Sequence, residues 1–409
     1  MKSFVALLTV SLLTLALISN GDDWPQWRGP NRNGISSEKG LLKKWPADGP
    51  PLAWKVGGLG DGYSSVSIAN GKIYTLGDLD DGSYAIALSE ADGKPVWKTR
   101  IGDSGGHKKY TGTRSTPTVS GDIVVILNQH GDLVCLDAGN GKVRWSKNLE
   151  KDFGGRMMSG WRYSESPLVD GDRVIATPGG REGTVVALDK KSGKKIWQTS
   201  DWTDSAGYSS VIIATIHGVR QYVQLTGDSV AGINPESGGL LWQAKRKGKT
   251  AVIATPIVEG DMVFVTSSYG VGCNGFRVKL SGSKWFTDEA YANLNIANHH
   301  GGVIGMDGHI YGATGGTFRC VEIKSGEQPW NERSVGKGAT VYADGKFYLR
   351  SEDGPVALID ASPTKYTEVS QFKQPDRARA KAWPHPVVAN GRLYLRDQDN
   401  LFAYNIKAR

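Results

Sequence analysis

Residues that can bind a polar or anionic ligand recur in several connecting segments of this chain. The segments GGHKKYTGTRSTP, GGRMMSGWRYSESP and DWTDSAGYSS combine charged, polar and aromatic side chains, and Asn-His-His and Trp-Pro-His occur further on. Guanidinium and imidazole groups supply hydrogen bonds, and aromatic rings supply stacking surfaces. If the fold brings these segments to one channel mouth, we expect a ligand-binding site there, formed by Arg114, Arg162, Tyr163, Glu165, Tyr208, His299, His300, Trp383 and His385.

Two groups among these residues also have a purely structural interpretation. Arg114 and Arg162 could instead form an internal ion pair with Glu165 that joins two loops. The adjacent His299 and His300 would point to opposite faces if they lay on a strand, and zinc needs three or four convergent ligands. We therefore predict no metal site, and the catalytic residues, if there are any, stay unknown.

Ser104 lies in a Gly-Asp-Ser-Gly-Gly segment that matches the nucleophile motifs of two hydrolase classes. No histidine precedes Ser104, which excludes the His, Asp, Ser order of the chymotrypsin-like proteases. The segment also follows an expected strand without opening a helix. Because no complete catalytic set is found, we favour a protein that is not an enzyme.

Repeated β-hairpins are the elements that must position these segments. A tight turn between two apolar runs occurs eight times, in contexts such as PTVSGDIVVIL and PVVANGRLYLR, with turn glycines 37 to 50 residues apart. This spacing is typical of four-stranded propeller blades. Glycine suits the turns because they need positive φ angles. The turn glycines are Gly71, Gly121, Gly171, Gly218, Gly260, Gly308, Gly345 and Gly391.

A second repeat places a tryptophan four residues after a glycine, in the strand that would end each blade. It gives Trp97, Trp145, Trp197, Trp242 and Trp330, whereas Trp285 arrives one residue early and the seventh repeat has no tryptophan. The eighth repeat lacks an outer strand, and Trp54 lies in an unpaired strand before the first hairpin. We therefore predict an all-β, eight-bladed propeller of four-stranded antiparallel blades, closed by an N-terminal outer strand.

Composition and the N-terminus indicate how the chain is divided and where it acts. Residues 1–21 have the pattern of a cleavable signal peptide, which predicts a periplasmic or secreted protein without a membrane span. We expect residues 22–50 to form an N-terminal strap over the surface and residues 51–409 to form the propeller. The net charge of +8 is spread along the chain, so we expect no nucleic-acid partner. The three cysteines are far apart and odd in number, which predicts buried thiols and not a disulfide framework.

The repeats resemble those of secreted bacterial propellers with pyrroloquinoline-quinone-like (PQQ-like) repeats. The segments DWPQWRGPNRNGIS, NHHGGVIGMDGHIYG and WPHPVVANGRLYLRDQDNLFAYN carry this resemblance. It extends distantly to the propeller of the outer-membrane barrel assembly machinery and to quinoprotein dehydrogenases. The first similarity implies a binding protein, although this chain lacks a lipid-anchor cysteine. The second implies PQQ with calcium, although this chain lacks the adjacent cysteines of the alcohol-oxidising enzymes.

We therefore predict an extracytoplasmic binding or scaffolding propeller of the cell envelope. Its partner would be a protein or a polar or anionic ligand, and we expect no cofactor. One alternative is a periplasmic PQQ-dependent dehydrogenase, an oxidoreductase that would hold PQQ with calcium. The other is a carbohydrate-binding or carbohydrate-acting propeller that uses the aromatic and basic mouth.

Overall fold

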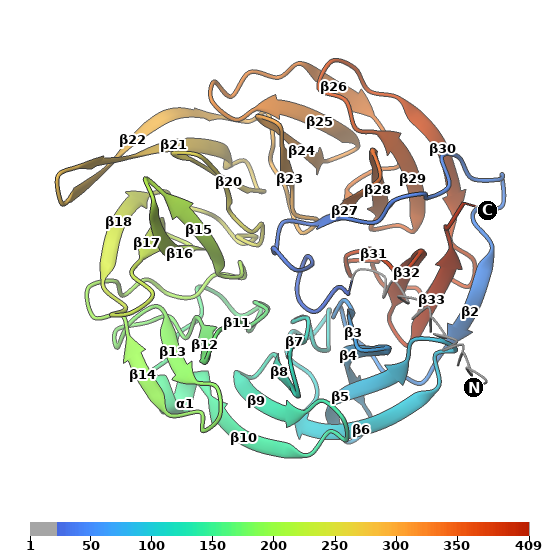
Figure 1. The fold of residues 1–409 in the computed structure, drawn as a ribbon, viewed down its shortest axis with the longest axis horizontal. Coiled ribbons are helices and arrows are strands. Elements are labelled where there is room, and N and C mark those ends of the chain that lie inside the picture. The colour runs from blue at the N-terminus through green and yellow to red at the C-terminus, as the bar shows by residue number, and fades with distance from the viewer. Residues whose placement is uncertain (1–22, 409) are drawn as a thin grey trace, which may run out of the picture.

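Eight β-sheets surround a central channel in the computed structural model, which describes residues 23–408. Figure 1 shows the sheets as a closed ring viewed along the channel. The described residues contain one short helix, α1 (Leu149–Phe153), and no helix in them is long and apolar enough to cross a membrane. The predicted eight-bladed propeller is confirmed, whereas the predicted signal peptide lies outside the described residues.

Each blade begins at the channel, and its strands follow one another outward. The first four blades are β3 (Ser67–Ala69), β4 (Lys72–Leu79), β5 (Gly82–Ser89) and β6 (Pro95–Gly102); β7 (Thr118–Ser120), β8 (Ile123–Leu127), β9 (Asp132–Asp137) and β10 (Val143–Asn148); β11 (Leu168–Asp170), β12 (Arg173–Ala176), β13 (Val186–Asp189) and β14 (Lys195–Gln198); and β15 (Ile212–Ile216), β16 (Val219–Leu225), β17 (Ser229–Ile233) and β18 (Leu240–Lys245).

The remaining blades follow the same order, except that the eighth takes its outer strand from the N-terminal part of the chain. They are β19 (Ile257–Glu259), β20 (Met262–Ser267), β21 (Gly272–Ser281) and β22 (Lys284–Asn293); β23 (Ile304–Met306), β24 (His309–Thr314), β25 (Thr317–Glu322) and β26 (Trp330–Arg333); β27 (Gly338–Ala343), β28 (Lys346–Ser351), β29 (Pro355–Asp360) and β30 (Glu368–Lys373); and β31 (Val387–Ala389), β32 (Arg392–Asp397), β33 (Asn400–Asn405) and β2 (Leu52–Val56).

The sequence pattern explains these strands. All eight predicted glycines lie in the turn between the first and second strands of a blade, and each has a positive φ angle. The middle strands are continuous apolar runs, such as Ile123–Leu127, that are buried on both faces because neighbouring blades pack against each other. The three cysteines are buried and free, as predicted.

The two ends of the propeller close on each other. Strand β2 pairs antiparallel with β33, with Trp54 opposite Ala403 and Val56 opposite Leu401. Figure 1 shows the two strands side by side although they come from opposite ends of the chain. This confirms that the N-terminal outer strand completes the last blade, and it covers the outward edge of β33.

Outer-strand aromatic residues pack on a glycine of the following blade. Trp145 lies on Gly193, where a Cβ atom would come within 2.8 Å of the indole, and its Nε1 donates to the Lys190 carbonyl oxygen at 2.8 Å. In the fifth blade Tyr291 occupies this position on Gly326, so the early Trp285 is not the equivalent residue. In the seventh blade, which has no tryptophan, Phe372 packs on Gly49.

The N-terminal segment, residues 23–47, goes deeper than the surface strap that we expected. Arg28 donates to the Val303 carbonyl oxygen, and Arg32 donates to those of Ser166 and Pro167 at 2.6 and 3.1 Å. Both guanidinium groups are buried in the channel, so residues 24–34 plug it. Figure 1 shows this blue segment inside the ring.

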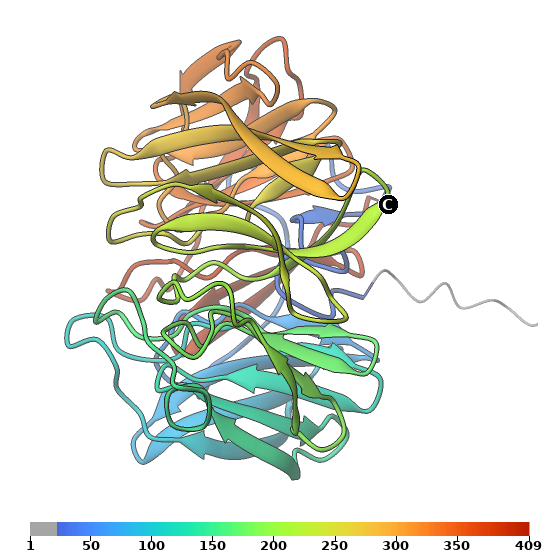
Figure 2. The same cartoon turned by 90° about the vertical axis from the view of Figure 1, so that its left-hand side faces the viewer.

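The rest of this segment crosses the face that carries the glycine turns. Strand β1 (Ile35–Ser36) pairs parallel with β27 and adds a fifth strand to the seventh blade. Glu38 accepts a hydrogen bond from the turn residue Gly391 at 3.3 Å, and Leu41 donates to Asp344 at 2.9 Å. The side view in Figure 2 shows part of this blue segment at one face of the disc. The channel is therefore closed at this face.

Candidate functional site

A cavity of about 220 Å³ lies at the other end of the channel. Most of its lining residues come from the segments that precede the inner strands, and these strands run from there to the glycine turns on the closed face. Trp27 of the plugging segment also lines it, and its Nε1 donates to Thr255 Oγ1 at 3.1 Å. We call this space the mouth cavity. The residues lining it are Trp27, Tyr63, Tyr110, Arg114, Trp161, Ser164, Tyr208, Ser210, Thr250, Ala251, Ile253, Tyr269, His299, His300, Lys337, Glu352, Lys381, Trp383 and His385.

The structure brings six of the nine predicted site residues to this cavity. They come from the loops before the inner strands of four different blades, which explains why distant parts of the sequence meet. They are Arg114, Tyr208, His299, His300, Trp383 and His385. Their position is thus established, and their role in binding a ligand stays a prediction.

Arg162, Tyr163 and Glu165 do not line the mouth cavity. Arg162 has a positive φ angle of 69° and an exposed side chain. Tyr163 and Glu165 are buried, whereas Ser164 between them lines the cavity. Successive side chains of an extended segment point to opposite sides, so only one of these neighbours faces the channel.

Glu165 belongs to the interior between blades and not to the mouth. It accepts hydrogen bonds from the Thr177 backbone N–H and from Gln224 Nε2. Burial raises the pKa of Glu165 to about 7, although the hydrogen bonds from Thr177 and the charge of Arg32 act in the opposite direction. The alternative ion pair of Arg114 and Arg162 with Glu165 is not formed in the described chain.

Arg114 is the cation of the cavity that has no acidic partner among residues 23–408. It donates to the Trp161 carbonyl oxygen at 2.6 Å and to the Tyr110 carbonyl oxygen. Its guanidinium also lies 5.8 Å from the Tyr63 ring centre and 5.9 Å from that of Trp161. Burial lowers the pKa of Arg114, but an arginine stays charged at neutral pH. Its charge is therefore held by carbonyl oxygens and aromatic faces alone.

The other charged groups of the cavity neutralise one another. Glu352 is 3.0 Å from Lys337 Nζ and 3.4 Å from Lys381 Nζ, and it accepts a hydrogen bond from Trp383 Nε1 at 2.9 Å. Lys381 also pairs with Asp353 at 2.5 Å. Burial tends to raise the pKa of Glu352, but Trp383 and Lys337 outweigh this and hold it below its usual value. Arg114 is therefore left as the unbalanced charge.

The three histidines of the cavity are neutral at physiological pH. Burial lowers the pKa of His385 to about 3 and that of His299 to about 4, and it also lowers the pKa of His300 well below its usual value. The Nδ1 atoms of His299 and His300 are 3.1 Å apart. These two residues do not lie on a strand, which is why both reach the cavity.

Aromatic rings form the walls at inclined angles. The Trp383 plane makes 39° with Tyr63 and 36° with Tyr110, at centroid distances of 4.8 Å in both cases. Trp27 and His385 are inclined by 51° at 4.4 Å. These rings therefore contact one another and form inclined walls of the mouth cavity.

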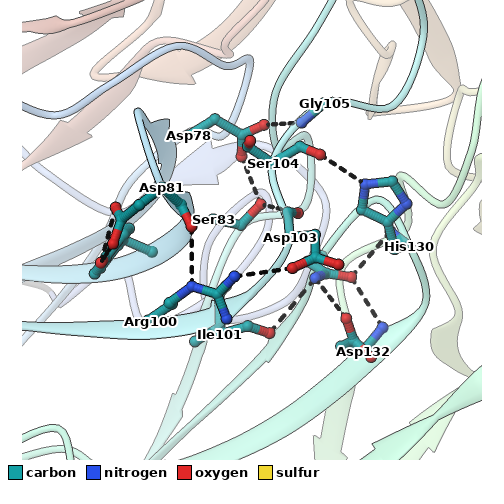
Figure 3. A network of polar contacts seen from close by, with 12 residues as sticks. Asp78, Asp81, Ser83, Arg100, Ile101, Asp103, Ser104, Gly105, His130 and Asp132 are labelled. Carbon is teal, nitrogen blue, oxygen red and sulfur yellow. Dashed lines mark hydrogen bonds and ion pairs between the residues drawn. The ribbon is translucent and has the colours of Figure 1, made fainter.

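The loop that carries Tyr110 is anchored by a buried carboxyl group. Asp78 accepts hydrogen bonds from Ser83 Oγ at 2.6 Å and from the Gly105 N–H at 2.7 Å, as Figure 3 shows. His130 Nε2 donates to the Ser104 carbonyl oxygen at 3.1 Å, and so contacts the backbone of Ser104 and not its hydroxyl group. The Gly-Asp-Ser-Gly-Gly segment therefore serves to hold the loop.

Some lining residues were not selected from the sequence. Tyr63 and Lys337 lie in the segments before the first strands of their blades, so the rule that found Arg114 also applies to them. Trp27 had no such signal, because its place depends on how the N-terminal segment enters the channel. Glu352 also had no such signal, because it follows β28, the second strand of the seventh blade, and not the segment before a first strand. The missed residues also include Tyr269 and Lys381.

The residues of the cavity do not fit calcium-bound PQQ. Calcium needs six to eight oxygen ligands, mainly from carboxylate and amide groups. Glu352 is the sole acid among the described lining residues, and two ammonium groups and an indole already engage it. No cluster of three or more His, Cys, Asp or Glu side chains able to hold a metal occurs within residues 23–408.

Comparison with known proteins identifies relatives by sequence. The family model described as outer membrane protein assembly factor BamB matches residues 80–332. The BamB of Yersinia pestis is 25% identical over 213 residues, which cover 47% of this chain and 53% of that protein. The quinoprotein alcohol dehydrogenase PedH of Pseudomonas putida is 22% identical over 275 residues, 64% of this chain and 40% of that protein. The matches span about half the length of these curated relatives.

Comparison with solved structures supports the fold. The crystal structure of BamB from Moraxella catarrhalis has a TM-score of 0.54 at 18% identity, covering 82% of this chain and 94% of that one. The quinohemoprotein alcohol dehydrogenase of Comamonas testosteroni has a TM-score of 0.63 at 12% identity, covering 94% of this chain and 80% of that one. At such identities the likeness concerns the propeller architecture alone.

Proposed function

Because this chain belongs to the PQQ-like propeller family whose model is described as outer membrane protein assembly factor BamB, we propose that it is an extracytoplasmic binding propeller. Its binding site is the mouth cavity, and its ligand is a small polar or anionic molecule of the cell envelope. The relatives are named for outer membrane protein assembly, which supports an envelope location and a scaffolding class. The apolar run in residues 1–21, as an export signal, agrees with this location.

The charge of Arg114 is the observation that carries this proposal. A cation that is largely removed from water without an acidic partner is costly, and a bound anion offsets that cost. Arg114 lines a cavity whose far end is plugged by residues 24–34, so a ligand enters from one side and is surrounded on the others. The cavity is therefore suited to holding a small anion and not to passing one through the channel.

The quinoprotein alternative has less support. The engagement of Glu352 by Lys337, Lys381 and Trp383 leaves no free carboxylate in the described cavity for calcium. A binding or scaffolding role needs no catalytic residues. His130 contacts the backbone of Ser104 and not its hydroxyl group. We accordingly propose a protein that is not an enzyme and has no resident cofactor.

The test measures binding and cofactor use in the same preparation. Thermal unfolding of the protein purified from the periplasm would be followed with small carboxylic acids and with their uncharged amides. We expect acids to raise the melting temperature of the wild type but not of Arg114→Gln. Arg162→Gln, which removes an exposed arginine on a neighbouring loop, is the matched control and should behave as the wild type.

A second arm adds PQQ and calcium, followed by dye-linked alcohol oxidation. We expect neither a bound chromophore nor turnover. Stoichiometric, tightly held PQQ with turnover would refute the binding role in favour of the dehydrogenase.

A further inference from the structure

We propose that the mouth cavity binds the terminal residue of an acidic saccharide, a single pyranose ring that carries one carboxylate. This inference rests on the proposed function, because it names the ligand class of the same cavity. It follows from four properties of the described lining residues: the size of the space, the inclination of the rings, the distribution of hydroxyl and imidazole groups, and the single unbalanced charge.

The size of the cavity limits the ligand to about one ring. Pockets that bury drug-sized ligands have volumes of roughly 300–1,000 Å³. The mouth cavity, at about 220 Å³, is smaller than these and is closed below by Trp27 and His385. An extended chain can therefore place only its end inside, with the rest leaving through the open side.

The inclination of the rings favours a three-dimensional ring over a flat one. A planar conjugated ligand is best held between parallel faces roughly 7 Å apart, twice the usual carbon contact distance. Trp383 instead contacts Tyr110, Tyr63 and His300 directly, at centroid distances of 4.8, 4.8 and 5.7 Å and angles of 36° to 40°, so these rings form one inclined wall with no slot between them. The parallel pair of His107 and Trp161 is 4.0 Å apart, which leaves no room for a third ring. A chair-shaped sugar presents C–H groups in several directions and so can contact several inclined faces at once.

The polar groups between the rings suit hydroxyl groups. Hydroxyl-bearing side chains line the cavity together with His299 and His300. His300 Nε2 is buried and has no hydrogen-bond partner. Neutral imidazoles and hydroxyl groups can both donate and accept, which matches the hydroxyl groups of a sugar. The hydroxyl-bearing residues are Tyr63, Tyr110, Ser164, Tyr208, Ser210, Thr250 and Tyr269.

The charge balance assigns one carboxylate to the ligand. Lys337 and Lys381 are paired with Glu352 and Asp353, so two positive and two negative charges cancel. Arg114 is the remaining charge, and its hydrogen bonds to the two carbonyl oxygens leave other N–H groups of the guanidinium to bind an anion. Guanidinium groups bind carboxylates through two parallel hydrogen bonds. A uronate would therefore place its carboxylate on Arg114 and its ring against Trp383.

The experiment compares ligands that differ only in charge. Isothermal titration calorimetry would measure glucuronate against glucuronamide and galacturonate against galacturonamide, where each amide has the same ring as its acid and no charge. We expect at least one uronate to bind the wild type ten times more tightly than its amide. Arg114→Gln should remove this difference, Arg114→Lys should retain part of it, and Arg162→Gln should leave it unchanged. Melting temperatures of all variants check that each is folded.

Further ligands separate this inference from the proposed function. If benzoate binds more tightly than either uronate and its binding depends on Arg114, the saccharide inference is overturned while the anion-binding function stands. A sulfated monosaccharide that binds more tightly than the uronates would likewise overturn the choice of a carboxylate. If none of these anions binds and Arg114→Gln changes nothing, the proposed function fails as well.

Discussion

Glu165 shows how one residue position separates a structural role from a binding role. It lies one residue from Ser164 of the mouth cavity, yet its side chain is 3% exposed and bonds to Thr177 in the interior. Its pKa of about 7 lies above the usual value of 4.5. The folded protein therefore binds a proton that the unfolded chain releases between these two pH values.

This protonation predicts a dependence of stability on pH. The contribution of Glu165 to the free energy of unfolding is fully present below pH 4.5 and is lost as the pH rises through about 7. Glu165→Gln stays neutral, so its change in stability between pH 5 and pH 8 should be smaller than that of the wild type by roughly 2 to 3 kcal/mol. Urea unfolding at both pH values measures this difference.

Glu236→Gln is the control for the Glu165 experiment, because Glu236 is an exposed carboxylate paired with Arg173. It should reproduce the pH dependence of the wild type. Identical pH dependence in Glu165→Gln would mean that Arg32 keeps Glu165 ionised in the folded protein.

At the scale of the elements, contacts between an aromatic ring and a glycine join successive blades. The ring of Trp145 packs on Gly193 of the next blade, that of Tyr291 packs on Gly326, and that of Phe372 packs on Gly49. The repeat therefore preserves a large flat ring above a position without a side chain, and not a tryptophan as such. Gly193 has a φ angle of 68°, which favours glycine there for a second reason.

Removing one of these rings should weaken the whole propeller. Trp145 is 8% exposed and donates a hydrogen bond to Lys190, so Trp145→Ala leaves a cavity and an unpaired carbonyl group. We expect a loss of about 3 to 5 kcal/mol in the free energy of unfolding, as for other large core aromatics. Phe286→Ala, which truncates a ring that is 50% exposed on β22, should change it by less than about 0.5 kcal/mol. An unchanged denaturation midpoint in Trp145→Ala would show that this packing does not stabilise the fold.

At the scale of the molecule, residues 23–56, which comprise the N-terminal segment and strand β2, hold the ring together. Strand β2 closes the circle by pairing with β33, and Arg28 and Arg32 bind backbone carbonyls from different blades inside the channel. Residues far apart in the sequence thus depend on the same short segment. The ring should unfold as a unit because no blade lacks a neighbour.

Deleting residues 400–409 tests this closure. The deletion removes β33 and leaves one edge of β32 and one edge of β2 unpaired, and exposed edges pair with other molecules. We expect soluble aggregates instead of a monomer with local fraying, as measured by size-exclusion chromatography with light scattering. Deleting residues 407–409 alone retains β33 and is the control. A monomeric and cooperatively folding 400–409 deletion would refute the closure argument.

The sequence by itself determined the architecture, because its evidence is local and repeated. The turn glycines and the apolar strands are recognised from residues only a few positions apart. Because this pattern occurs eight times, it gives the number of blades. The same count showed that Trp54 must complete the last blade, and β2 pairs with β33 as expected. It also placed six of nine site residues at one mouth, because the inner end of each blade is fixed by the repeat.

Only the tertiary structure decided the direction of individual side chains and the contacts between distant segments. Ser164 lines the cavity, whereas the next residue, Glu165, is buried in the interior. The spacing of the repeats does not determine which of two adjacent loop residues faces the channel. The place of Trp27 depends on the N-terminal segment, which lies outside the repeats and enters the channel, where Trp27 contacts Thr255. The neutralisation of Lys337 and Lys381 by Glu352 depends on distances across loops, since charges interact through space and not along the chain.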